Sequence, residues 1–497
     1  MIKLFQDKNF EKLLFFVLFS LVLLFLDFQS LFFLQPRSFH FIRQTDSLSF
    51  INYYTKTGFN FFNIGNLNLY NGTGKTACEF PIFYYIVALL SKTGIKSYLL
   101  LKFLYLIIFF ITSFCTYSFI RKKNRFIDAL SITFLLFSST VILYYTLNYI
   151  PNYPALCFTL IACIYFLNYI ETNTKKDINL SIVFFLFASL LKITFAIYPI
   201  ACFLYLAVRF FIYKKNERKP LLFFIMSFVV VVIWNFHVVY YNTVNHANYY
   251  LTATKPLWSA TSGERHEVID FILNYWLYKY YYQSTIHLFF IVIFLSLIFY
   301  KKLNRHYFFV SLLFFLGVTS YFILFFKQFR DHDYYFLEFI PLLFLVFYHS
   351  FITIKHIGNH KIVQAILSGI ILIISLLSIN YAKINLQRRY DKPFEQVSKI
   401  AYTLEGMEAK FDSLAISKDA KVLVIPDNTM NGSLYYINRF GYTRVDTTNI
   451  KVYIDRSDYI LITDSTFPAE IIKKFNVQNM GLFYRGTSLY KINNFKP

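Results

Sequence analysis

The feature that most constrains this chain is a series of apolar segments of about twenty residues, separated by short polar stretches. A run of that length spans the hydrocarbon core of a bilayer as an α-helix. Hydrophobic residues make up 57% of the 497-residue chain, and charged residues only 15%. A soluble protein of this size exposes more charge, so the composition predicts a polytopic α-helical membrane protein.

About eleven of these segments are long enough to cross the membrane. A shorter segment, 82–90, is typical of a helix that lies at the interface. Between 179–195 and 196–213, only Tyr198-Pro199 could mark a turn, but the distribution of basic residues favours two helices. The expected spans are Leu13 to about Leu34, 98–120, 127–147, 153–171, 179–195, 196–213, 221–241, 284–300, 307–326, 335–354 and 361–381.

Lysine and arginine cluster in the short connections, an excess that is typical of cytoplasmic loops. If the N-terminus is cytoplasmic and about eleven helices cross the membrane, all these clusters fall inside. We therefore expect a multi-pass protein of the bacterial cytoplasmic membrane, and no nucleic-acid partner in spite of the net charge of +22. The clusters are 121–125, 175–176, 214–219, 301–305 and 355–361.

The composition changes after about Tyr381. Residues 422–425 and 459–462 are typical of buried strands, and 468–475 of a short helix. This length suffices for one small α/β domain. We therefore expect a transmembrane domain over 1–382, with a large outer loop at 35–97, and an extracytoplasmic α/β domain over 383–497.

The first loop holds dense polar chemistry in its segments Arg43-Gln44-Thr45-Asp46 and Cys78-Glu79-Phe80-Pro81. Arg43 precedes Asp46 by three residues, so the two side chains would share a face of a helix. A carboxylate can act as a general base while nearby cations hold an anionic donor. Asp46 and Glu79 are therefore candidate catalytic residues, with Arg43 as an anion ligand; a solvated loop would also explain these charges.

Two other polar positions lie at the ends of apolar runs. Lys192 interrupts one of these runs, either because its side chain snorkels to the interface or because it binds a phosphate. Arg330 and His332 belong to a cluster of charged residues that could bind phosphate or form a solvated turn. His332 and Asp333 alone are a weak metal signal, and we predict neither a metal nor another cofactor.

These motifs resemble those of the GT-C superfamily of membrane glycosyltransferases. The similarity is greatest to the family 39-like branch, which includes protein O-mannosyltransferases and the lipid A aminoarabinose transferase. It covers the whole chain: a many-helix core, a large first outer loop and a C-terminal outer domain. The matching residues are Arg43-Gln44-Thr45-Asp46, Glu79-Phe80-Pro81 followed by Tyr85, Lys192, and His332-Asp333-Tyr334-Tyr335.

The resemblance implies a sugar donor on a polyprenyl phosphate, a lipid, glycan or protein acceptor, and inversion at the sugar carbon. It implies that Asp46 is the base, that Glu79 is a second acid and that Lys192 binds the donor phosphate, with Arg330 as a further candidate. Many members place two acids side by side, whereas Thr45 and Ser47 flank Asp46 here. This departure argues against a bridging metal.

Three other classes of protein fit parts of the pattern. A polymerase or ligase of polyprenyl-linked glycans would be expected to carry its large loop late among the helices. A lipid or sugar transporter would be expected to show repeated halves with broken helices, and no repeat is evident. A non-catalytic envelope scaffold is the least specific of these alternatives.

Overall fold

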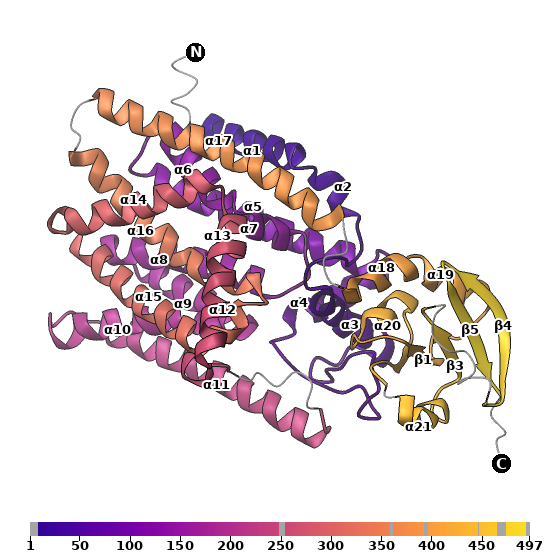
Figure 1. Ribbon diagram of the computed structural model, residues 1–497. Helices are drawn as coiled ribbons and strands as arrows, with labels where there is room; N and C mark the ends of the chain where they lie inside the picture. The colour runs from indigo at the N-terminus through magenta and orange to yellow at the C-terminus, as the bar shows by residue number, and fades with distance from the viewer. Residues whose placement is uncertain are drawn as a thin grey trace.

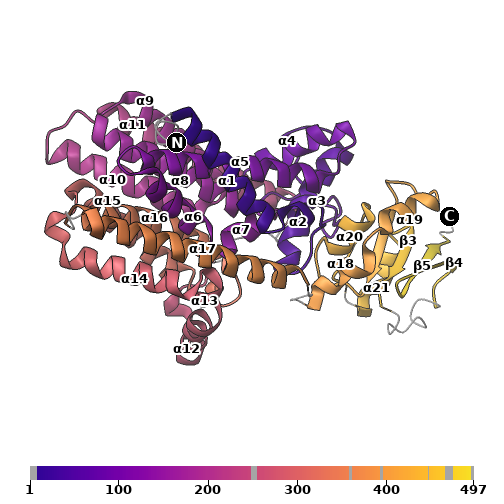
Figure 2. The same ribbon diagram turned by 90° about the horizontal axis from the view of Figure 1, so that it is seen from above.

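The computed structural model describes residues 8–247, 254–357, 361–391, 396–445, 447–464 and 474–493. A helical body and a small sheet lie at opposite ends of the molecule, with α3 near their junction (Figure 1). A view turned by 90° shows the same separation (Figure 2). Most of the predicted short helix 468–475 lies outside the described residues.

The helical body begins with α1 and ends with the long helix α17, and short 3-10 turns join several of its helices. Its helices are α1 (Lys8–Phe25), α2 (Phe28–Phe32), α3 (Phe41–Thr57), α4 (Ile82–Leu90), α5 (Ser97–Arg121), α6 (Phe126–Phe137), α7 (Thr140–Thr146), α8 (Asn152–Thr172), α9 (Lys175–Leu191), α10 (Ile197–Phe211), α11 (Arg218–Val244), α12 (Ser262–Phe271), α13 (Leu277–Tyr280), α14 (Gln283–Ile298), α15 (Arg305–Leu324), α16 (Ile340–Ile357) and α17 (Lys361–Asp391).

Within the described residues, seven helices are long and apolar enough to cross a membrane, or nine if each of two bent pairs is one span. This confirms the predicted class, a multi-pass helical membrane protein. Two other expected spans are helical, but one is too short and the other carries too many charged residues to be counted. Helix α9 has 17 residues, and α1 has 18 residues and carries Lys8, Glu11 and Lys12.

The first expected span is interrupted near its end. Asp27 adopts a left-handed backbone conformation with φ of 61°, which separates the end of α1 at Phe25 from the start of α2 at Phe28. Its carboxylate Oδ1 accepts a hydrogen bond from Ser30 Oγ at 2.7 Å. A single helix over 13–34 was therefore the wrong expectation.

The segment 179–213 forms two helices, as the basic residues indicated, but the break lies at Lys192 and not at Tyr198-Pro199. Lys192 is extended, with φ of −153° and ψ of 110°. Arg209, near the end of α10, donates from Nη2 to Asn173 Oδ1 at 2.9 Å, next to the start of α9. Helix α10 therefore returns to the side from which α9 started.

Basic residues collect at that same end of the helical body. Arg121 Nη2 lies 2.7 Å from Glu11 Oε1, and Lys355 Nζ lies 2.6 Å from Asp128 Oδ2. Lys122 Nζ donates to Asn168 Oδ1 at 2.8 Å. These contacts connect the end of α5 to the start of α1 and the end of α8, and the end of α16 to the start of α6.

The C-terminal part contains a five-stranded sheet in the order β2-β1-β3-β5-β4. The first three strands are parallel, whereas β5 and β4 add antiparallel edges. The two predicted strands are confirmed as β1 and β3, which pair with Val422 opposite Tyr459. The elements are α18 (Lys399–Leu404), α19 (Met407–Ser413), β1 (Lys421–Ile425), α20 (Gly432–Ile437), β2 (Phe440–Tyr442), α21 (Ile450–Ile454), β3 (Tyr459–Ile462), β4 (Val477–Tyr484) and β5 (Thr487–Ile492).

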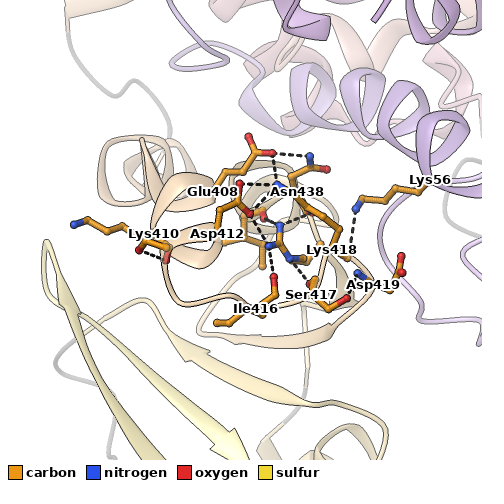
Figure 3. Close-up of polar contacts among 12 residues, drawn as sticks. Lys56, Glu408, Lys410, Asp412, Ile416, Ser417, Lys418, Asp419 and Asn438 are labelled. Carbon is orange, nitrogen blue, oxygen red and sulfur yellow. Dashed lines mark hydrogen bonds and ion pairs between the residues drawn. The ribbon is translucent and has the colours of Figure 1, made fainter. Parts of the chain in front are cut away.

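The C-terminal part packs against α3 and the first loop. Lys56 of α3 donates from Nζ to the carbonyl oxygen of Lys418 at 3.0 Å, and Asn438 Nδ2 donates to Glu408 Oε1 at 2.8 Å (Figure 3). The backbone N–H of Leu69 donates to the oxygen of Gly441 at 2.8 Å. The Lys56 and Leu69 bonds thus tie α3 and the first loop to the C-terminal part, whereas the Asn438–Glu408 bond lies within that part.

Candidate active site

A cavity of about 440 Å³ collects most of the polar residues that the sequence singled out. Its walls come from the start of α3, the loop before α4, the junction of α9 and α10, one face of α11, and the turn before α16. Its volume lies in the range of small-molecule sites. The candidate residues that line it are Arg43, Asp46, Glu79, Lys192 and His332.

Asp46 lies on α3, one turn after Arg43, and is only 1% exposed. Its Oδ1 accepts a hydrogen bond from Asn431 Nδ2 at 2.8 Å. Asn431 directly precedes α20, and its own Oδ1 accepts from Ser49 Oγ at 2.9 Å. The C-terminal part of the chain therefore contacts the candidate base directly, a contact that the sequence did not predict.

Arg43 and Glu79 form an ion pair across the cavity wall. Arg43 Nη2 lies 3.3 Å from Glu79 Oε1, which also accepts from Tyr84 Oη at 2.6 Å. Burial raises the pKa of Glu79, but the Arg43 guanidinium and hydrogen bonds from Cys78 and Tyr84 outweigh it and lower the pKa. Glu79 is therefore an ionised partner of Arg43, whose charge it partly neutralises.

Lys192 occupies the extended residue between α9 and the 3-10 turn Ile193–Ala196. Its Nζ lies 5.8 Å from the centroid of the Tyr335 ring, and it makes no ion pair among the described residues. An ammonium group held in this way can interact with the phosphate of a ligand. The break in the apolar run therefore delivers this cation to the cavity.

His332 also lines the cavity, and its ring contacts those of Tyr334 and Tyr335 at centroid distances of 5.2 and 5.7 Å. Burial, with a contribution from His40, lowers the pKa of His332 to about 3. The imidazole is therefore neutral near pH 7. It can donate a hydrogen bond to a phosphate oxygen, but it does not supply the positive charge expected of a cationic ligand.

Arg330 does not line this cavity. Its Nη2 lies 2.6 Å from Glu267 Oε1, and its carbonyl oxygen accepts from Trp276 Nε1 at 2.9 Å. Its side chain is 44% exposed. Only Asp331 separates Arg330 from His332 in the chain, yet Arg330 pairs with Glu267 while His332 lines the cavity, so their nearness in the sequence did not produce a shared site.

A second buried network lies beside the cavity. Asp333, fully buried, accepts from Arg389 Nη2 at 2.5 Å and from His40 Nε2 and Tyr145 Oη at 3.0 and 2.5 Å. Arg389 was assigned to the C-terminal domain by the sequence, but α17 continues to Asp391 and carries it here. Because His40 precedes α3, this network fixes the start of the helix that carries Asp46.

Glu338, also fully buried, contacts a residue of the cavity wall. Its Oε1 accepts from Thr194 Oγ1 at 2.6 Å, and Thr194 itself lines the cavity.

Among the described residues, no group of three or more His, Cys, Asp or Glu side chains is arranged to hold a metal ion. The cavity thus combines two carboxylates, Asp46 and Glu79, with two cations and several hydroxyl groups.

One wall of the cavity comes from α11, a helix with a lipid-facing side. Trp234, Asn235 and Val238 line the cavity, whereas Ile233 and Phe236 of the same helix are 62% and 71% exposed. Exposed apolar side chains on a membrane-spanning helix contact lipid tails. The cavity is therefore one helix away from the membrane interior, which suits a ligand with a polar head and a long apolar tail.

Comparisons with solved structures find the same architecture elsewhere. ArnT from Cupriavidus metallidurans in the apo state superimposes with a TM-score of 0.62 at 10% identity, over 95% of this chain and 97% of that chain. The same protein bound to undecaprenyl phosphate gives 0.61 at 11% identity over the same shares. The arabinofuranosyltransferase AftD from Mycobacteria gives 0.51 at 11% identity, over 97% of this chain and 40% of that chain.

The likeness is one of fold. A scan against protein-family models finds no match, and neither does a comparison with curated protein sequences. At 10–11% identity the structures establish a shared architecture and carry over no individual residue. The many-helix body with a small C-terminal sheet, expected from the sequence, is confirmed by this agreement.

Proposed function

We propose that this chain, which has the GT-C fold of these structures, transfers a sugar from a polyprenyl-phosphate donor to a lipid, glycan or protein acceptor. The reaction would take place at the outer face of a bacterial cytoplasmic membrane, where the first loop and the C-terminal domain would lie. The observation that carries the proposal is the cavity itself. It brings Asp46, Arg43 and Lys192 together beside a lipid-facing helix.

The donor phosphate would lie between Arg43 and Lys192. Breaking the bond between the sugar carbon and the phosphate oxygen leaves its electron pair on the phosphate, so negative charge grows there. Fixed cations in a partly dehydrated site stabilise this charge without reorganising, and one such group commonly contributes about 10²–10³ in rate. His332 would add a neutral hydrogen bond, and Arg330 has no part in the proposed site.

Asp46 would accept the proton of the acceptor hydroxyl or amine as the acceptor attacks. The new bond forms on the face of the sugar opposite the departing phosphate, so the configuration at that carbon inverts. Asn431 would orient the Asp46 carboxylate through its 2.8 Å hydrogen bond. Glu79, already paired with Arg43, would position that guanidinium and would not act as a second base.

Two facts support the choice of donor. The cavity borders a helix whose outer side is apolar, which a polyprenyl tail requires. ArnT, whose fold this chain shares, has been solved with undecaprenyl phosphate bound. The proposal extends that ligand class to this protein.

The test uses purified protein in lipid nanodiscs with a panel of polyprenyl-phosphate sugars, each with a radiolabelled sugar, and candidate acceptors. We expect transfer from at least one donor, release of the polyprenyl phosphate, and a product of inverted configuration. Sugar nucleotides in place of the lipid donor should give none. Translocation of a labelled lipid across vesicles without transfer from any donor would indicate a transporter and refute the proposal.

A further inference from the structure

A second, larger cavity of about 810 Å³ lies at the other end of the helical body. It opens between the connection of α8 to α9 and the connection of α10 to α11. In Figure 1 the connection of α10 to α11 lies at the end away from the sheet. Lys175 at the start of α9 lines this cavity, whereas Lys192 just beyond the end of α9 lines the candidate active site. The proposed function makes no use of this second cavity.

The lining of this cavity is strongly positive. Glu217 is its one acidic residue, and it is 1% exposed and paired with Arg209, whose Nε lies 3.0 Å from its Oε1. Four other basic residues line the cavity without an acidic partner in the part of the chain that the structure describes. They are Lys175, Lys215, Arg218 and Lys219.

The surroundings of the cavity are apolar. Phe223 lines it and is 41% exposed, and Phe211, Ile212 and Leu222 close by in the chain are 66%, 67% and 54% exposed. Helix α11, and α10 together with the 3-10 turn before it, are long and apolar enough to cross a membrane, so these side chains face lipid. A basic cavity at the end of such helices meets the lipid bilayer at the level of the headgroups.

We propose that this cavity binds the headgroup of an anionic phospholipid, whose acyl chains lie along α10 and α11. Four like charges in one cavity repel one another, and an anion among them relieves this repulsion. A soluble phosphate would neutralise the charges, but it would make no contact with the adjacent apolar side chains. The charge and the apolar border together favour a lipid.

Binding is measured by native mass spectrometry and by thermal unfolding of the detergent-purified full chain. The probes are phosphatidylglycerol, phosphatidylcholine with the same acyl chains, and soluble glycerol phosphate. We expect tighter binding and a higher unfolding temperature with phosphatidylglycerol than with either of the others. Equal effects of the two lipids would refute the charge recognition, and equal effects of glycerol phosphate would identify a soluble-anion site instead.

The variant K215Q/R218Q/K219Q removes three of the four unpaired charges. Each basic residue near an anionic headgroup contributes about fivefold in affinity, so we expect a loss on the order of a hundredfold for phosphatidylglycerol. The control K301Q/K302Q/R305Q removes the same charge outside the cavity, and we expect less than a twofold change. Equal losses in both variants would overturn the proposal; since no sugar transfer is measured, its outcome is independent of the proposed activity.

Discussion

The contact between Asn431 and Asp46 yields the sharpest prediction, because it joins the C-terminal part of the chain to the proposed base. Asn431→Ala removes the amide that donates to Asp46 Oδ1 at 2.8 Å and accepts from Ser49. The side chain lies in a fully buried setting, so water does not readily replace the lost donor. We expect slower sugar transfer in a protein that still folds.

The expected size of the effect follows from the charge of Asp46, the carboxylate that accepts this hydrogen bond. A hydrogen bond to a charged group contributes about 1.5–3 kcal/mol, and about 1.36 kcal/mol corresponds to a tenfold change in rate. We therefore expect kcat/KM to fall about tenfold to a hundredfold. Because the bond favours the ionised carboxylate, the low-pH limb of the pH–rate profile should also move to higher pH.

Asn438→Ala is the matched control. Asn438 lies at the other end of α20 and also donates to a carboxylate at 2.8 Å, that of Glu408, away from the cavity (Figure 3). Its loss should lower the unfolding temperature and leave kcat/KM of the folded protein within about twofold. If both variants lose activity equally, or if the pH profile of Asn431→Ala does not move, α20 has only a structural role and the reasoning fails.

Three other predictions concern the cavity and its support. Lys192→Gln should lower kcat about 10²–10³-fold. The control Lys92→Gln, on a turn outside the cavity, should leave kcat unchanged. Equal kcat values for Lys192→Gln and the native chain would show that Lys192 does not bind the donor phosphate. The pKa of Glu79 is lowered in the folded protein, so its contribution to stability is present above the usual glutamate pKa and is lost as the pH falls from there through the lower folded pKa. Unfolding temperatures measured from pH 6 to pH 3 should therefore decline less steeply for Glu79→Gln, and equal slopes would contradict this role. Asp333→Asn breaks the buried pair with Arg389 and should cost about 3–5 kcal/mol in denaturant unfolding, and an unchanged midpoint would contradict the assigned role of that network.

Much of the site could be predicted because its signals are local. The spacing of Arg43 and Asp46 placed both on one face of a helix, and α3 has this form. Lys192 stood out because a charged side chain within an apolar run is energetically unfavourable and therefore indicates a functional role. The structure places it in the wall of the cavity. Segment length and charge distribution predicted the membrane-spanning class of the fold.

The missing parts depend on contacts between distant residues. Asn431 meets Asp46 across 385 positions, and nothing near either residue indicates the pairing. The end of α17 was set too early because the apolar pattern fades after about Tyr381, although helical structure continues to Asp391 and brings Arg389 to Asp333. Arg330 was grouped with His332 because the two are close in the chain, but closeness in the chain does not show in which direction each side chain of a turn points.

The central claim is that Asp46 is the base in transfer from a polyprenyl-phosphate sugar. The most direct test compares single-turnover transfer by the native chain and by Asp46→Asn, with donor binding measured on the same samples. The asparagine keeps an oxygen that can accept from Asn431, so the fold should be retained, and loss of a general base commonly costs about 10²–10⁴ in rate. We predict a fall in rate of at least a hundredfold with donor affinity nearly unchanged; transfer at the native rate by Asp46→Asn would contradict the account.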